Sequence, residues 1–597
     1  MATLPKMLRR LWSRLSARRK RQFAGIVALI FASAVAEVVS LGAVLPFLAV
    51  LAVPDKVLKY PFVAPALRAF GVTTSSDLVF ALALGFACAA AVAGVLRTLL
   101  LRAMTRVAYS TGADFSVEVY RRTLYQPYQV QITRNSSELI SGITGKLAET
   151  VNILNQILLL ISASVLVVFI MSALFFINPA VAGLAMASFG SGYAAITYLS
   201  RKQLRMNGQR AAAAHTQVVK ALQEGLGGIR DVLLDGTQPA YCEIYSRAEY
   251  EMRRAYGNIV FASASPRYAM EALGMVLIAA LAFGLSRTTS GLSSAIPALA
   301  ALALGAQRLL PVLQQGYSAW ATISGGQQSL AVTLDLLSQP LPPEALEPAP
   351  APLPFKHSVQ FSSVSFRYAS GPWVLNDVDL TIRRGMRVGF VGSTGSGKST
   401  LLDLLMGLLP PTQGQLLVDG EALSGSRVRS WQRVIAHVPQ SIFLADRSVA
   451  ENIAFGVAPA AIDMERVRFA ARQAQISEFI EARPEGYEAW VGERGIQLSG
   501  GQRQRIGIAR ALYKKASVLV FDEATSALDN ATEQSVMDAI DGLDRELTIL
   551  LIAHRLTTVR RCDVIVELEH GRMVGQGSYE EMLKSSSSFR NMVRTVA

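Results

Sequence analysis

The sequence predicts a chain of two domains, an all-α membrane domain followed by an α/β domain with a mainly parallel sheet. Three observations lead to this prediction. Of the 597 residues, 51% are hydrophobic and only 17% are charged, which is too apolar for an ordinary soluble enzyme of several domains. Six apolar stretches in the first half are long enough to cross a bilayer. In the second half, short runs of Val, Ile and Leu alternate with helical patterns.

The chain begins with a basic segment that should stay in the cytoplasm. Lysine and arginine, with no acidic residue among them, occupy many positions between residues 6 and 21, directly before the first apolar run. This positive-inside pattern predicts a multi-pass protein of the plasma (inner) membrane with a cytoplasmic N-terminus. A cleaved secretory signal is not expected, because the apolar run continues to about residue 53. Since the basic residues flank membrane spans, the net charge of +14 does not indicate a nucleic-acid partner.

The six predicted spans alternate with segments of different length. The segments after the second and fourth spans are long, polar and basic, so they should lie in the cytoplasm with the N-terminus. Their composition is helical, and we therefore expect the membrane helices to continue into the cytoplasm and to turn near residues 126–127 and 236–239. The spans are expected near residues 23–53, 78–101, 158–177, 180–199, 269–285 and 296–313.

A proline-rich stretch marks the boundary between the domains. Residues 338–354, "SQPLPPEALEPAPAPLP", have no hydrophobic periodicity and few charges, as in a semi-rigid spacer. We therefore predict a membrane domain over residues 1–337, a linker over 338–354 and one α/β domain over 355–597. The three cysteines are scattered and predict neither a disulfide framework nor a metal site.

The α/β domain contains a phosphate-binding motif. The stretch "VGSTGSGKST", residues 391–400, satisfies G-x-x-x-x-G-K-[ST] between an apolar strand and a helical pattern, which is the context that the motif requires. Its backbone N–H groups should surround the phosphates of ATP, while Lys398 neutralises the β and γ phosphates and Ser399 holds Mg²⁺. The predicted cofactor-binding residues are Gly392, Ser393, Thr394, Gly395, Ser396, Gly397, Lys398, Ser399 and Thr400.

Two further strands of this domain end in residues suited to phosphoryl chemistry. The strand over residues 518–521 leads into Asp522, a candidate Mg²⁺ ligand through water, and Glu523, a candidate general base that polarises the attacking water. His554 follows another apolar strand and is a candidate to contact the γ phosphate, although a single histidine there is also compatible with a structural role. Ser499 precedes a helical pattern, and helix starts attract phosphate.

Taken together, these motifs resemble the nucleotide-binding domain of ABC transporters. The six spans resemble the exporter-type membrane domain, so the resemblance implies a six-helix transmembrane domain followed by an α/β P-loop ATPase domain of ABC type, with ATP hydrolysis coupled to substrate movement. The matching features are Tyr368, the phosphate loop, "VPQ" at 438–440, "GERG" at 492–495, "LSGGQ" at 498–502, "FDEATSALD" at 521–529 and "AHR" at 553–555.

The resemblance also assigns roles to individual residues. It implies that Tyr368 stacks on adenine, that Gln440 senses Mg²⁺ and the membrane domain, that Asp529 belongs to a loop crossing between subunits, and that His554 is the switch histidine. In this family the LSGGQ serine grips the γ phosphate bound by the other subunit. A second copy is therefore required, and a homodimer is its simplest form. The residues expected to complete the partner's site are Ser499, Gly500, Gly501 and Gln502.

Charged residues inside the spans suggest what is transported. Glu37 lies in the first span, where an ionisable group is costly and serves either function or a hydrogen bond between helices. Arg97, Arg267 and Arg308 lie at similar depth toward the cytoplasmic side, and three converging guanidinium groups would bind a phosphate or pyrophosphate headgroup. Alternatively, these arginines extend to the inner interface and Arg267 pairs with Glu271.

The first outer loop points to a lipid cargo. Residues 54–72 carry apolar side chains that would rest a short helix on the outer leaflet. With the first span, this loop resembles the lipid-linked oligosaccharide flippases among ABC exporters, which implies a phosphate-bearing glycolipid as cargo. Multidrug, peptide and lipid A exporters remain alternatives. An ABC-type channel or regulator is a more distant one, because such proteins commonly lose a catalytic residue such as Glu523.

Overall fold

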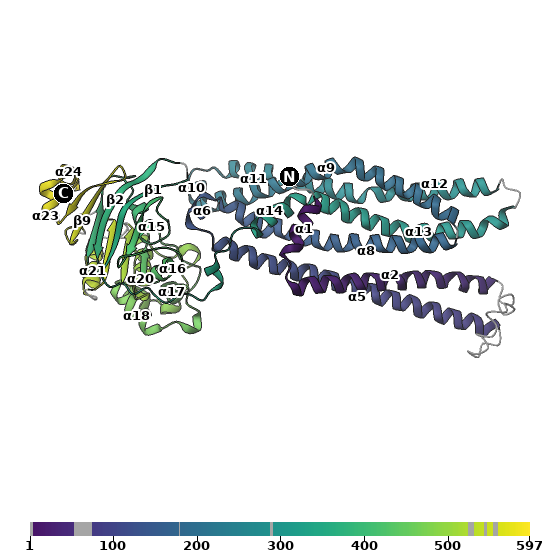
Figure 1. The fold of residues 1–597 in the computed structure, drawn as a ribbon, viewed down its shortest axis with the longest axis horizontal. Helices are drawn as coiled ribbons and strands as arrows, with labels where there is room; N and C mark the ends of the chain where they lie inside the picture. The colour runs from purple at the N-terminus through teal and green to yellow at the C-terminus, as the bar shows by residue number, and fades with distance from the viewer. Residues whose placement is uncertain are drawn as a thin grey trace. The chain divides into compact units, whose positions relative to one another are not determined.

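The computed structural model describes residues 4–52, 75–177, 179–286, 291–369, 371–522, 530–542, 546–552 and 559–596. These residues form two compact units (Figure 1). The first, here called the helical unit, comprises Met1–Gln126 and Arg134–Leu341. The second, here called the sheet unit, comprises Pro342–Ala597 together with the short segment Pro127–Thr133.

Long helices make up the helical unit, and each predicted span lies in one of them. The spans fall in α2, α5, α8, α9, α12 and α13 in chain order. The elements of this unit are α1 (Leu4–Arg14), α2 (Ala17–Ala52), α5 (Ser75–Leu124), α7 (Ser136–Ser141), the π-helical turn η1 (Gly142–Lys146), α8 (Leu147–Ile177), α9 (Pro179–Gly227), α10 (Ile229–Leu234), α11 (Gln238–Ala264), α12 (Pro266–Ser286), α13 (Gly291–Gly325) and α14 (Gln327–Leu337).

The apolar character of these helices fits a lipid environment. Within the described ranges, three helical stretches are long and apolar enough to cross a membrane: Ala17–Ser40, Asp77–Leu124 and Ser136–Phe176. Large apolar side chains on several helices are exposed, among them Phe80 and Phe176. In water such a surface would be unfavourable, whereas the acyl chains of a bilayer would cover it.

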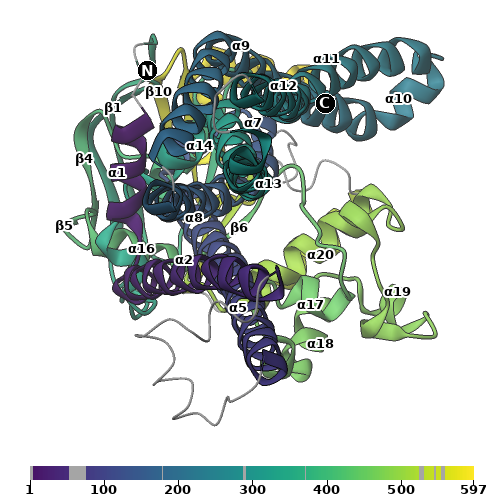
Figure 2. The same cartoon turned by 90° about the vertical axis from the view of Figure 1, so that its right-hand side faces the viewer.

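The predicted continuation of the helices beyond the spans is confirmed. Helix α5 continues to Leu124 and α9 to Gly227 without a break, and α11 begins at Gln238 after the predicted turn. Neighbouring helices pack along these extensions, for example α2 beside α5 (Figure 2) and α9 beside α11. Helices α9 and α13 approach closely at Gly208, where an added Cβ would overlap the backbone carbonyl oxygen of Gly325.

The sheet unit contains a six-stranded sheet that positions the phosphate loop. Its order is β10-β9-β3-β8-β7-β6, and all neighbours are parallel except β10 with β9. This arrangement confirms the predicted mainly parallel sheet. The strands are β3 (Arg387–Val391), β6 (Ile435–Val438), β7 (Val518–Asp522), β8 (Thr548–Ile552), β9 (Val564–Glu569) and β10 (Arg572–Gly577).

A second, antiparallel sheet of four strands was not predicted. Its order is β2-β1-β4-β5, and β1 pairs with both β2 and β4 in antiparallel register. Some of the short apolar runs of the second half, which were predicted to form the mainly parallel sheet, belong here instead. The strands are β1 (Ser358–Arg367), β2 (Trp373–Arg383), β4 (Gln413–Val418) and β5 (Glu421–Ala422).

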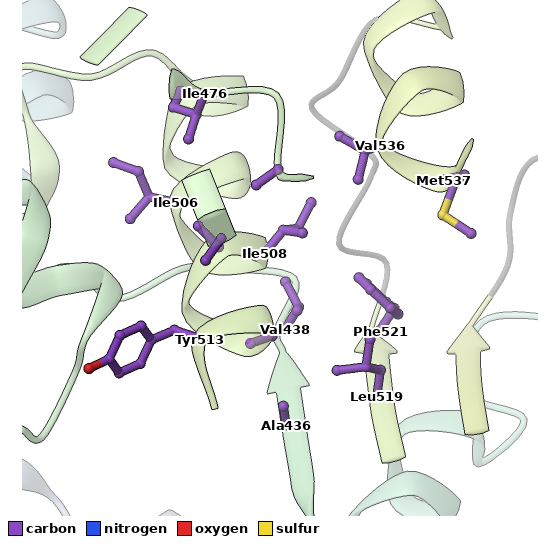
Figure 3. Packing of buried hydrophobic residues seen from close by; sticks show 14 of the residues in the cluster. Ala436, Val438, Ile476, Ile506, Ile508, Tyr513, Leu519, Phe521, Val536 and Met537 are labelled. Atoms are coloured by element: carbon purple, nitrogen blue, oxygen red, sulfur yellow. The ribbon is translucent and has the colours of Figure 1, made fainter. Parts of the chain in front are cut away.

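Helices cover the six-stranded sheet and close its core. Ile508 of α20, Val438 of β6 and Phe521 of β7 contribute to one buried apolar cluster (Figure 3). Because helices bury these strands, the strands read as continuous apolar runs. The helices of the sheet unit are α6 (Tyr128–Thr133), α15 (Lys398–Leu405), α16 (Ser426–Gln432), α17 (Val449–Ile453), α18 (Met464–Gln473), α19 (Ser477–Glu481), α20 (Gly500–Tyr513), α21 (Asn530–Asp541), α23 (Tyr579–Ser585) and α24 (Ser587–Val596), with short 3-10 turns at Pro343–Leu346, Pro459–Ala461, Gly486–Glu488 and Glu493–Gly495.

Candidate nucleotide-binding site

The phosphate loop joins the end of β3 to the start of α15 through three glycines with positive φ. The φ angles are 146° at Gly392, 82° at Gly395 and 102° at Gly397, a range that side chains rarely tolerate. Space is also restricted, because a Cβ on Gly397 would lie 2.7 Å from Cδ2 of Leu375. A Cβ on Gly392 would overlap the carbonyl oxygen of Leu568. The loop can therefore follow this path only with glycine at these positions.

Lys398 closes the loop from its first helical position. Its Nζ donates hydrogen bonds of 2.9 Å to the carbonyl oxygens of Gly392 and Ser393, and the residue is buried. These bonds hold the ammonium group within the curve of the loop. Ser396 is only 2% exposed, and its Oγ has no hydrogen-bond partner in the described structure. A buried hydroxyl without a partner is uncommon in folded proteins, and a phosphate oxygen would satisfy it.

Asp522 lies at the same edge of the sheet as the phosphate loop. It ends β7, and its backbone pairs with Ile552 of β8, which in turn neighbours β3. In parallel strands the carboxyl ends meet at one edge, where ligands bind. Burial, together with the charge of Asp522, raises the pKa of Asp403 on α15 to about 6. Ser399, in the first turn of α15, therefore has a carboxylate in its vicinity.

Tyr368 and Gln440 border this edge from two other elements. The hydroxyl of Tyr368 lies 3.5 Å from Oγ1 of Thr400, and its ring packs edge-on against Phe366 with centroids 4.9 Å apart. Gln440 lies two residues beyond β6, which pairs with β7. The structure thus brings Tyr368, the phosphate loop, Gln440 and Asp522 to one side of the sheet. Hydroxyl, carboxylate and amide oxygens of this kind are ligands that Mg²⁺ accepts.

The segment "LSGGQ" at residues 498–502, here called the signature segment, leads into α20, as predicted. Ser499 is the N-cap, and its Oγ accepts a 3.3 Å hydrogen bond from the backbone N–H of Gln502. The Gln502 side chain in turn accepts from the N–H of Ser499 at 2.8 Å, which completes a capping box. The hydrogen bonds of Ser499 are thus local ones, and Gly500 and Gly501 form the first turn of the helix.

Three residues with predicted roles lie outside the described residues. They are Glu523, Asp529 and His554. Their roles as general base, crossing-loop residue and switch histidine stay predictions.

The structure adds two residues to the site that the sequence did not indicate. Asp403 lies four residues after Ser399, on the same face of α15. Tyr128 of α6 is brought into the sheet unit from a distant part of the chain. Burial raises the pKa of the Tyr128 phenol, and Asp403, Tyr368 and Asp522 add to that rise. The only signal in the sequence was the turn predicted at Pro127, just before this helix.

The charged residues of the spans are arranged differently from the predicted trio. The Glu37 carboxylate forms ion pairs with Arg97 of α5 and Arg308 of α13. Arg267 does not join them, because its Nε pairs with Glu271 at 2.7 Å one turn along α12, as the alternative interpretation predicted. Glu37 therefore links α2 to α5 and α13 through ion pairs with two of the three arginines.

Comparison with known proteins agrees with this architecture. Residues 23–306 match the family model "ABC transporter transmembrane region", and residues 375–526 match the model "ABC transporter". The ATP-dependent lipid A-core flippase of Cupriavidus metallidurans is 31% identical over 80% of this chain and 80% of its own length. A solved bacterial Atm1-family ABC exporter with ATP bound superimposes with a TM-score of 0.77 and 25% identity, covering 97% of this chain and 98% of that one.

Other relatives match a smaller part of the chain at higher identity. The heterocyst differentiation ATP-binding protein HepA of Nostoc is 44% identical over 38% of this chain and 37% of its own length. The β-(1→2)glucan export ATP-binding/permease protein NdvA of Rhizobium meliloti is 44% identical over 40% of each chain. These matches therefore span well under half the length of those relatives.

The fold and the site define a membrane protein with a P-loop ATPase domain. A helical transmembrane region is followed in one chain by an ATP-binding α/β domain. The chain belongs to the ABC transporter family and is a half-transporter of the exporter type, whose cytoplasmic ATPase is coupled to movement of a substrate across the membrane.

Proposed function

We propose that two copies of this chain form a homodimer that uses ATP and Mg²⁺ to flip a phosphate-bearing glycolipid, such as a lipid-linked oligosaccharide, across the plasma (inner) membrane. The observation that carries the cargo assignment is the cluster of Glu37, Arg97 and Arg308 inside the membrane spans. We name it the span cluster. Multidrug, peptide and lipid A export are the alternatives, followed by an ABC-type channel or regulator.

The charge of the span cluster favours an anionic cargo. The Glu37 side chain is only 10% exposed, and Oε1 accepts from Nη1 of Arg308 at 3.2 Å while Oε2 accepts from Arg97. The two arginine side chains are 56% and 48% exposed. Two guanidinium groups against one carboxylate leave positive charge at membrane depth, where it is costly unless an anion or a water-filled cavity faces it. Each guanidinium has five N–H donors, so further donors can reach a phosphate.

The names of two relatives point in the same direction. One is a lipid A-core flippase and another is a glucan exporter, and both names include a saccharide-bearing cargo. A cargo with both a saccharide and a phosphate group suits the span cluster better than a neutral drug.

At the nucleotide site, we assign roles to the residues that meet at the sheet edge. Tyr368 stacks on adenine, and Lys398 with the loop N–H groups binds the β and γ phosphates. Ser399, Asp522 and Gln440 hold Mg²⁺, which would neutralise charge that develops on the transferred phosphate. Downstream of the described strands, Glu523 accepts a proton from the attacking water and His554 positions that water.

Two features support a second copy of the chain. The N–H groups at the start of α20 are a ready site for a phosphate, because a helix start carries partial positive charge. In the helical unit, α10 presents Leu233 and Leu234 as exposed side chains, which another surface would cover favourably. In the dimer, residues 1–337 form the membrane domain, 338–354 the linker and 355–597 the nucleotide-binding domain.

The cargo assignment is tested by the ATPase activity of the full chain in nanodiscs of neutral lipid. Added undecaprenyl-pyrophosphate-linked oligosaccharide should stimulate hydrolysis more than a phosphate-free glycolipid. In R97Q and R308Q the concentration for half-stimulation should rise about tenfold, because a charge-assisted contact is lost. R267Q is the matched control and should respond as the wild type does, since Arg267 pairs with Glu271. Equal responses of R97Q, R308Q and wild type would remove the assignment.

A further inference from the structure

A cavity lined mainly by residues with polar side chains lies outside the span cluster, between α9 and α11 in the helical unit. Its volume is about 480 Å³. We name it the α9–α11 pocket. Asn207 and Arg210 line it from α9, and Tyr250, Glu251, Arg254 and Asn258 line it from α11.

The packing of the two helices explains why a cavity forms there. Farther along α9, the seam between the helices is apolar and closed by Ala214, Val218 and Met252, which are all buried. Asn207 lies seven residues before Ala214, about two turns nearer the predicted membrane span. The α11 residues are spaced so that they share one helix face. The apolar seam therefore ends at a polar opening, on the side that faces the membrane spans.

The groups that line the pocket offer donors that are not used elsewhere. Asn207 is only 4% exposed, and its Nδ2 has no hydrogen-bond partner in the described structure. Neither Arg210 nor Arg254 forms an ion pair or a side-chain hydrogen bond with any described residue, whereas neighbouring Arg253 pairs with Glu249 at 2.7 Å. Burying a donor without a partner is unfavourable, so a ligand that accepts from Asn207 would be favoured.

The net charge of the pocket is positive, with two arginines against Glu251. The paired N–H donors of a guanidinium group match the oxygens of a phosphate group. Two guanidinium groups and an amide donor can therefore bind one phosphate from two sides. Glu251 accepts only, so it would bond a hydroxyl or ammonium group beside the phosphate. This combination occurs in phospholipid headgroups such as phosphatidylglycerol and phosphatidylethanolamine.

The pocket lies on the cytoplasmic side of the predicted span, beyond the headgroup layer. Asn207 lies eight residues after the predicted end of its span at residue 199, about 12 Å along the helix. The polar layer begins at the edge of the hydrocarbon core and is about 5 to 7 Å thick on each side. Helix side chains tilt toward the N-terminus, so Arg210 leans from α9 toward the membrane, whereas Arg254 leans from α11 away from it.

We propose that the α9–α11 pocket binds a phosphate ester, held by Arg210, Arg254 and the Nδ2 of Asn207. Basic pockets between membrane helices on the cytoplasmic side are suited to lipid headgroups. The phosphate belongs either to a phospholipid of the inner leaflet or to a soluble ester from the cytoplasm. The site does not depend on which cargo the transporter moves, because it shares no residue with the span cluster.

Native mass spectrometry of the full chain in detergent tests this site. Phosphatidylglycerol is titrated into the wild type, the double variant R210Q/R254Q, N207L and the matched control R253Q. The double variant should bind the first lipid about tenfold more weakly or worse, and N207L severalfold more weakly, because they lose charge-assisted and neutral donors. R253Q removes one positive charge, as R254Q alone does, from a neighbouring arginine that is already paired, and should bind as the wild type does.

A competition experiment identifies the molecule that supplies the phosphate, and a second set of variants covers the case in which the double variant does not fold. Glycerol phosphate is added as a competitor: displacement of the lipid assigns the site to soluble esters, and retention assigns it to the lipid, so both support a phosphate site. If the double variant fails to fold, the single variants R210Q and R254Q, which change exposed side chains, take its place. Lipid binding equal to the wild type in these variants, or an equal loss in R253Q, would overturn the proposal.

Discussion

Asp403 shows how one side chain of the nucleotide site opposes stability. Its pKa is raised to about 6 by burial and by the charge of Asp522, so the folded protein binds the proton more tightly than the unfolded chain does. The ionised carboxylate therefore destabilises the fold at pH 7, and this cost disappears as the pH falls from about 6 toward the ordinary value of 3.8. A negative group is retained beside Asp522 despite this cost, which is consistent with a site for a cation.

D403N should therefore stabilise the protein at neutral pH. The carboxylate is partly exposed, so solvent screening reduces the gain to about 1 kcal/mol, or roughly 2–4 °C in unfolding temperature. Thermal unfolding of the full chain in nanodiscs at pH 7 and pH 4.5 measures this gain. The difference in unfolding temperature between D403N and the wild type should shrink at the lower pH. D419N is the contrasting control, because Asp419 accepts three backbone N–H bonds and its loss should destabilise. A pH-independent effect of D403N would contradict the interpretation.

At the scale of elements, the crossing of α9 and α13 depends on the absence of side chains. At Gly208 an added Cβ would overlap the carbonyl oxygen of Gly325, whose backbone cannot move aside as a flexible side chain can. Leu204, at the same seam of α9, is completely buried. Close approach of backbones through small residues is a usual way for membrane helices to associate. The two helices therefore form one packed pair.

G208A should separate α9 from α13 and destabilise the helical unit by about 1–3 kcal/mol, the usual cost of overpacking. G190A is the matched control on the same helix, since nothing lies within 4 Å of its added Cβ and alanine is the better helix former. Unfolding temperatures of both variants in the same nanodiscs provide the comparison. An unfolding temperature of G208A at or above that of G190A would show that the crossing tolerates a side chain.

Local patterns predicted most of the elements but not their long-range pairing. The membrane helices and the parallel strands were predictable because apolar runs of characteristic length encode them. The antiparallel sheet was not predicted, because the pairing of β1 with β2 and β4 cannot be read from the local hydrophobic pattern of any one strand. The phosphate loop was predicted from its motif. The span cluster joins Glu37 to Arg308, which are 271 positions apart, so only the folded structure could show this contact. The local pairing of Arg267 with Glu271 was already one of the two predicted alternatives.

At the scale of the whole molecule, we propose that two copies of the chain complete each nucleotide site together. The phosphate loop begins α15 and the signature segment begins α20, so each chain contributes two different phosphate-binding helix starts. In a head-to-tail pair, the loop of one copy faces the signature of the other, and a symmetric dimer forms two such sites. Closure of these sites would supply the force that reorients the membrane helices.

Mixed dimers test this claim most directly. A chain with K398A, which disables the phosphate loop, is combined with a differently tagged chain with S499R, which blocks the signature, and the mixed dimers are purified through both tags. Shared sites predict that both defects fall in one site and leave the other intact. After hydrolysis of ATP, mixed dimers should therefore trap ADP with vanadate, while dimers of either variant alone do not. If each chain completed its own site, every site in the mixed dimer would be defective, and no trapping above that of the single-variant dimers would contradict the account.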